Sequence, residues 1–129
     1  MLKAKVHDIR SNDHLMDDFM RYEPDDPWDE FGWFGVDVGT SCMGGQDYFQ
    51  CLVTTTRARH RAVSGLKDSR CFVVDPYEPK GILDALTEKI NGVEGVEWCN
   101  IVDRLREFMH WEYDGMDGSS TQYFPSRPS

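Results

Sequence analysis

Few residues in this sequence have the types and spacing that catalysis requires. His60 stands among Arg57, Arg59 and Arg61, and an imidazole beside guanidinium groups could act on RNA or another phosphate ester as a general acid or base. A short helix through these positions would instead spread the four side chains around its axis. We therefore favour a solvated basic face that balances an acidic surface, with a small RNA or phosphate-ester enzyme as the alternative.

Metal chemistry has less support. The four histidines and four cysteines contain no His-x-x-x-His or Cys-x-x-Cys pair that would place two ligands on one element. The aspartates between Asp13 and Asp29 lack the alternating ligands and closing glutamate of a calcium loop. We predict no metal and no cofactor. The cysteines are expected to be buried, reduced thiols, with two disulfides as the alternative: Cys42, Cys51, Cys71 and Cys99.

The segment from Glu23 to Phe34 favours binding over catalysis. It combines five carboxylates with four aromatic side chains, and its two prolines disfavour a helix or a central strand up to Trp28. An exposed tryptophan ringed by negative charge suits a basic protein partner. Phe31 and Phe34 are assigned to the core, whereas Trp28 and Trp33 could each be a strap on the core or a contact. The candidate binding residues are Asp25, Asp26, Trp28, Asp29, Glu30 and Trp33.

Composition supports this interpretation. The 14 basic and 23 acidic side chains give a formal net charge of −9, which disfavours direct contact with nucleic acid and favours basic protein partners. No export signal or membrane-spanning run is evident. A chain of 129 residues can bury a core of its own. We therefore expect one domain in a cytoplasmic, membrane-free protein, as a monomer or a homodimer.

The elements that must position these residues follow from periodicity. Alternating patterns predict a first strand at 2–9 and a hairpin of strands 34–38 and 49–53 that turns at Gly44-Gly45. An apolar run predicts a strand at 71–74, and an edge strand could follow at 111–113. Helical spacing predicts amphipathic helices at 79–91 and 98–109, with shorter helical segments at 15–22 and 54–65.

This order predicts an α+β, two-layer domain. An antiparallel sheet of about four to five strands would be covered on one face by the two amphipathic helices. The other face would be exposed, covered by residues 11–30 or used for binding. The domain is expected to span 1–114, followed by a Gly/Ser/Pro-rich tail at 115–129.

The order of these motifs resembles the immunity protein 8 family of bacterial polymorphic-toxin systems. The resemblance covers most of residues 1–114 and departs at 55–61, where members tend to show a Trp-Leu-type pair. The motifs that carry it are the opening strand 2–9, the acidic Glu23-Pro-Asp-Asp-Pro turn before Phe31-Gly-Trp-Phe34, the strand 47–54, and the helix 98–105 with Trp111-Glu-Tyr113.

The resemblance implies a small cytoplasmic α+β protein that binds and neutralises a cognate toxin domain and has no catalysis of its own. Our hypothesis is that the toxin has a basic surface, such as the cleft of a nuclease, and meets the acidic-aromatic segment. A non-immunity adaptor with the same fold is a further alternative.

Overall fold

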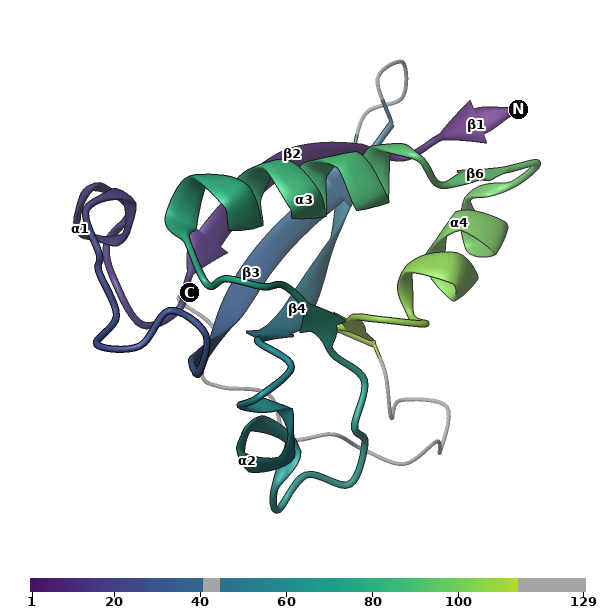
Figure 1. The fold of residues 1–129 in the computed structure, drawn as a ribbon. Coiled ribbons are helices and arrows are strands. Elements are labelled where there is room, and N and C mark those ends of the chain that lie inside the picture. The colour runs from purple at the N-terminus through teal and green to yellow at the C-terminus, as the bar shows by residue number, and fades with distance from the viewer. Residues whose placement is uncertain (41–44, 114–129) are drawn as a thin grey trace.

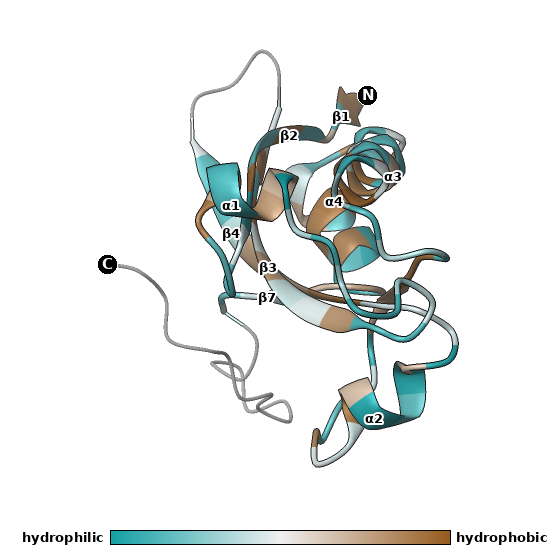
Figure 2. Ribbon diagram, turned by 60° about the vertical axis from the view of Figure 1, so that its left-hand side comes forward, coloured by the Kyte–Doolittle hydropathy of each residue, from teal (hydrophilic) through white to brown (hydrophobic). Residues whose placement is uncertain are grey.

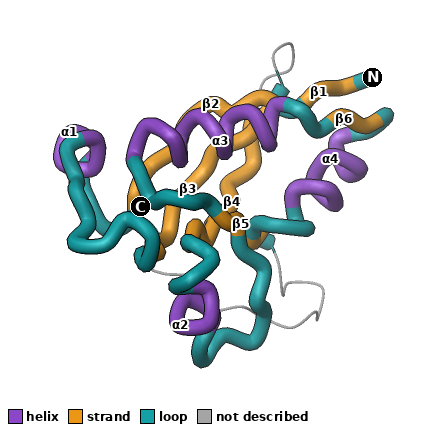
Figure 3. The backbone as a smooth tube through the Cα atoms, viewed as in Figure 1, coloured by secondary structure: helices purple, strands orange, loops and turns teal. Residues whose placement is uncertain are grey.

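The computed structural model describes residues 1–40 and 45–113 (Figures 1 and 3). Its strands are β1 (Leu2–Lys3), β2 (Lys5–Ser11), β3 (Phe31–Gly39), β4 (Gln46–Thr54), β5 (Phe72–Val73), β6 (Glu94–Gly95) and β7 (His110–Trp111). Its helices are α1 (Met16–Met20), α2 (Arg59–Val63), α3 (Pro79–Asn91) and α4 (Trp98–Leu105).

The main sheet has five strands in the order β2-β3-β4-β5, and β7 also pairs with β4. All pairings are antiparallel except β4 with β5, and the central hairpin is in register from Phe31 opposite Thr54 to Gly39 opposite Gln46. A separate two-stranded sheet joins β1 to β6, with Leu2 opposite Gly95. The predicted α+β class is confirmed.

The core lies between the sheet and two helices on one of its faces (Figure 2). Phe34, Val36 and Val38 alternate along β3 and are fully buried, as their period-two pattern predicts. The helices supply residues at helical spacing, which bury one stripe of each: Ile82, Leu86 and Ile90 from α3, and Ile101, Val102 and Leu105 from α4. The predicted cover of one face by two amphipathic helices is therefore confirmed.

Local capping explains where these helices start. Glu78 accepts a hydrogen bond from the backbone nitrogen of Gly81 (2.6 Å), and Pro79 occupies the first turn, where no backbone donor is needed. At α4, Glu97 and Asn100 form a capping box. The carboxylate acceptors at both starts also complement the positive end of the helix dipole.

The opposite sheet face carries a polar network. Arg10 donates to Asp37 (2.8 Å) and to Asp8, Gln50 donates to the Tyr48 hydroxyl (2.6 Å), and Asn12 donates to Gln50 (2.7 Å). Residues 11–30 do not cover this face with apolar side chains. Instead, Phe19 of α1 packs against Phe34, which lies on the helix side (ring centroids 5.2 Å apart).

Several sequence expectations need correction. Phe31 is only half-buried and lies under the Arg61 guanidinium (5.4 Å to the ring centroid), so it is not a core residue. It alternates with Phe34 onto the other sheet face. The helix predicted at 98–109 ends at Leu105, although Met109 is still fully buried. The segment 54–65 forms only the five-residue α2, because Thr55 bonds a turn that precedes it.

The cysteines also differ from expectation. Cys51 is buried, Cys71 is partly exposed and Cys99 is exposed, and all three are free thiols. The prediction of a buried thiol is therefore confirmed in full for Cys51 alone among these three. Cys99 is exposed because it lies on the polar side of α4, where it contacts Glu97. Cys42 and the Gly44 part of the predicted turn lie outside the described residues, as does the 115–129 tail.

Candidate functional site

The stretch between α1 and β3, residues 21–30 and here called the acidic loop, presents Trp28 to solvent. The Trp28 side chain is large and apolar, yet the residue is 51 % exposed. Asp26 organises this turn, because its carboxylate accepts from the Trp28 nitrogen (2.9 Å) and its carbonyl accepts from the Asp29 nitrogen (3.1 Å). The exposure of Trp28 therefore comes from a hydrogen-bonded turn around Pro27.

Both ends of this turn are tied to the rest of the domain. The Tyr77 nitrogen donates to the Pro27 carbonyl (2.6 Å), and the Thr55 nitrogen donates to the Glu30 carbonyl (3.0 Å). The Glu30 nitrogen returns a hydrogen bond to the Thr55 hydroxyl (3.2 Å). These bonds fix the backbone on each side of Trp28, so that side chain is held out from a positioned loop.

The basic segment at 57–61 lies against the acidic loop at the same end of the sheet (Figure 1). Arg57 pairs with Asp26 (3.2 Å), and Arg61 pairs with Asp29 (2.6 Å). The basic face of this segment therefore neutralises part of the acidic loop's charge through direct ion pairs, as the sequence predicted. Within the described ranges, Asp25 and Glu23 are exposed and make no ion pair.

Trp33 has a different setting from Trp28. It projects from β3 on the sheet face opposite the helices, is half-buried, and lies 5.6 Å from the His110 ring between centroids. The candidate residues therefore fall into two groups. The structure brings Asp25, Asp26, Trp28, Asp29 and Glu30 together on the acidic loop and leaves Trp33 on the sheet.

The sequence of this domain matches a known protein family. The family model described as Immunity protein 8 matches residues 4–116. The chain belongs to the immunity protein 8 family. It is thus an immunity protein, and the family implies a cognate toxin as its partner. No curated protein matches this immunity protein, and no solved structure does.

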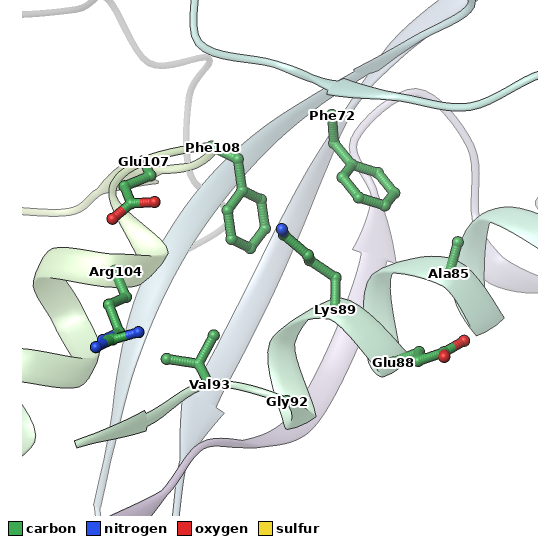
Figure 4. A pocket seen from close by; sticks show the side chains of 9 residues that line it. All are labelled: Phe72, Ala85, Glu88, Lys89, Gly92, Val93, Arg104, Glu107 and Phe108. Carbon is green, nitrogen blue, oxygen red and sulfur yellow. The ribbon is translucent and has the colours of Figure 1, made fainter.

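His60 lies on the surface of this immunity protein, away from the two hollows of its described part. His60 is exposed on α2, and it lines neither of the two described hollows. The larger hollow, about 580 Å³, lies between α3 and α4, where Lys89 points between Phe72 and Phe108 (Figure 4). The phosphate-ester alternative required side chains that converge on His60, and the geometry does not support it.

The described residues were also compared with what a metal site or a membrane span requires. Residues 1–40 and 45–113 bring together no group of histidine, cysteine and carboxylate side chains able to hold a metal ion. In the same ranges, no helix has the length and apolar character needed to cross a bilayer.

Leu15 and Met20 are exposed, beside Asp17 and Asp18. A helical projection that places Phe19 inward would have indicated the exposure of Met20.

A hydrogen bond between Tyr22 and Glu30 joins the two ends of the immunity protein's acidic loop. Its hydroxyl donates to Glu30 (2.5 Å), which raises the pKa of Tyr22 to about 12 because the phenolate would face a carboxylate. Burial also raises the pKa of Tyr77. A phenol whose pKa is higher in the folded state than in the unfolded state stabilises the fold. This stabilisation is complete at pH values below the pKa of the unfolded state, and it is lost as the pH rises toward the pKa of the folded state.

Tyr22→Phe is therefore expected to reduce the fall in unfolding free energy between pH 10 and about 12. Denaturant unfolding at a series of pH values would measure it, with absorbance titration of tyrosine ionisation alongside. Tyr113→Phe, which removes an exposed tyrosine, is the control. Some pH dependence should persist through Tyr77. An identical pH profile for Tyr22→Phe and the parent protein would contradict the role of this hydrogen bond.

Proposed function

We propose that this protein neutralises its toxin by docking the acidic loop onto a basic surface of the toxin, in the cytoplasm. The observation that carries the proposal is the half-exposed Trp28 on a loop whose backbone is fixed on both sides. Trp28 would be the aromatic anchor and the surrounding carboxylates the charged rim. The contact residues are Asp25, Asp26, Trp28, Asp29 and Glu30, with Trp33 at the sheet as a second, separate contact.

Two physical effects support this assignment. Tryptophan is enriched among interface residues that carry most of the binding energy, and a loop whose backbone is already fixed loses little conformational entropy on binding. The net charge of −9 would attract a basic toxin over a distance and disfavours direct contact with nucleic acid. A nuclease-type toxin has such a basic surface. The inhibitor would act as a monomer or homodimer, by occupying the surface and without chemistry of its own.

The primary test is co-expression with the product of a neighbouring gene, which is the candidate toxin. The immunity protein should co-purify with that toxin and restore growth of cells that produce it. Co-purification without restored growth would identify an adaptor. The absence of both co-purification and restored growth would overturn the proposed function. Catalytically inactive toxin would allow affinities to be measured in vitro.

Asp25→Lys combined with Asp26→Lys tests the acidic rim. Reversing these charges is expected to slow association with the toxin at least about tenfold at low ionic strength and to flatten its salt dependence. Stopped-flow measurements at several salt concentrations would show both changes. The matched control is Asp84→Lys with Asp103→Lys, which makes the same net-charge change on α3 and α4. Equal effects of the two double variants would show that overall charge, not the acidic loop, sets the rate.

A further inference from the structure

The ion pairs between the acidic loop and the basic segment at 57–61 affect how a basic partner can bind; this inference rests on the proposed function. Arg57 Nη1 lies 3.2 Å from Asp26 Oδ2, and Arg61 Nη1 lies 2.6 Å from Asp29 Oδ1. Two of the loop's five carboxylates are thus already occupied by cations of the same chain. A third, Glu30, accepts a hydrogen bond from Tyr22.

The two arginines differ from their neighbour on the same segment. Arg57 and Arg61 stand four residues apart and both face the loop, and Arg61 also covers the ring of Phe31 at 5.4 Å. Arg59 lies between them in sequence, is exposed, and forms no ion pair in the described part of the chain. The basic segment at 57–61 therefore contains two arginines that engage the proposed docking surface and one that does not.

We propose that Arg57 and Arg61 compete internally with the toxin for Asp26 and Asp29. In the free protein they shield the two carboxylates that flank Trp28. Both ion pairs are substantially exposed to water, so each is weak enough for a well-placed partner cation to replace it. The displaced guanidinium groups then return to solvent.

This competition selects a particular kind of partner. An isolated lysine on an unrelated basic protein gains little by displacing an arginine that already fits the carboxylate. A toxin surface gains more if it presents two cations at the spacing of Asp26 and Asp29 together with a recess for Trp28. The arginines would therefore lower affinity for all basic surfaces but leave the cognate toxin preferred.

The test compares Arg57→Gln and Arg61→Gln with Arg59→Gln, which changes the net charge equally. The probes are an inactive form of the toxin identified by that co-expression and, as a defined basic probe, a decalysine peptide. Arg57→Gln and Arg61→Gln are each expected to raise affinity for both probes about two- to fivefold at low salt, in proportion to the weak exposed pair that is lost. The gain for decalysine should exceed that for the toxin, and Arg59→Gln should have a smaller effect.

Three results would overturn the competition. Equal gains for all three variants would show that only long-range charge matters. Unchanged affinity would show that the ion pairs do not oppose binding, and weaker binding would show that the arginines contact the toxin directly. The Asp25/Asp26 reversal in the same assay separates this inference from the proposed function. If that reversal weakens binding but the glutamine variants do not strengthen it, only the competition is wrong.

Circular dichroism and denaturant unfolding keep these comparisons interpretable. Glutamine retains hydrogen-bonding capacity toward the carboxylates, and the backbone bonds of Pro27 and Glu30 do not involve either arginine side chain. Unfolding free energies of the three glutamine variants should agree to within about 1 kcal/mol, since exposed ion pairs contribute little.

Discussion

Trp28→Ala is expected to lower affinity for the toxin at least about 30-fold, the loss typical of a central aromatic anchor. The residue is 51 % exposed in the free protein, so the toxin would bury the remaining apolar surface. Most of the loss should be a faster dissociation rate, because the carboxylates that speed association remain in place. Surface plasmon resonance with inactive toxin would separate the two rates.

Controls for Trp28 test both its size and its position. Trp28→Phe keeps an aromatic ring and should recover part of the affinity. Trp33→Ala probes the separate contact on the sheet, next to His110. If Trp28→Ala binds as tightly as the parent protein while Trp33→Ala loses affinity, the docking surface is the sheet face and not the acidic loop.

Phe34→Ala is expected to lower the free energy of unfolding by about 3–5 kcal/mol. Phe34 is fully buried, and its ring meets Phe19 edge-on at 5.2 Å, so the substitution removes an aromatic contact between α1 and the sheet. Domains of this size are stable by only about 5–15 kcal/mol, so the variant should be close to unfolding. Urea unfolding followed by tryptophan fluorescence would measure the change.

Trp28→Ala is the natural contrast to Phe34→Ala. The first should weaken toxin binding with little change in unfolding free energy, because its side chain is exposed, and the second should mainly reduce stability. Phe34→Leu should cost less than Phe34→Ala, because it leaves a smaller cavity. A Phe34→Ala protein as stable as its parent would mean that α1 does not pack on the sheet as described.

Long, regular patterns in the sequence were sufficient to predict the central fold. In α3, Pro79 at the start and Asn91-Gly92 at the end bracket an apolar stripe, so both helix limits could be predicted. In β3 and β4, alternation fixed which residues face the helices, except that Phe31 follows the opposite parity from Phe34. These elements are long enough for their periods to be distinguished.

The predicted strands at 2–9, 71–74 and 111–113 overlap the short strands β1, β5 and β7, but β6 was missed. The limits and partners of these strands could not be predicted, because two residues have no measurable period. β1, β5, β6 and β7 each have two residues in the strand, and they exist because the tertiary fold supplies a neighbouring strand. The parallel pairing of Phe72 with Val53 depends on the path of the whole connection from β4 to β5. Local sequence preference does not encode that path.

Only the features of the candidate site that are local in sequence could be predicted. Prolines and acidic residues indicated that Trp28 lies on an exposed loop, and this feature is local in sequence. The pairing of Arg57 with Asp26 and of Arg61 with Asp29 joins segments about thirty residues apart. Only the folded chain shows that the apparent excess of negative charge on the loop is partly compensated.

The pairing of β1 with β6 has a consequence for when the protein becomes functional during its synthesis. Leu2 lies opposite Gly95, and Gln50 lies opposite His110, so both sheets require residues made late. A ribosome-bound chain that has emerged only as far as α3 lacks the partner of its first strand. Such contacts between distant residues slow folding. The immunity protein can therefore complete both sheets only after β6 and β7 have left the ribosome.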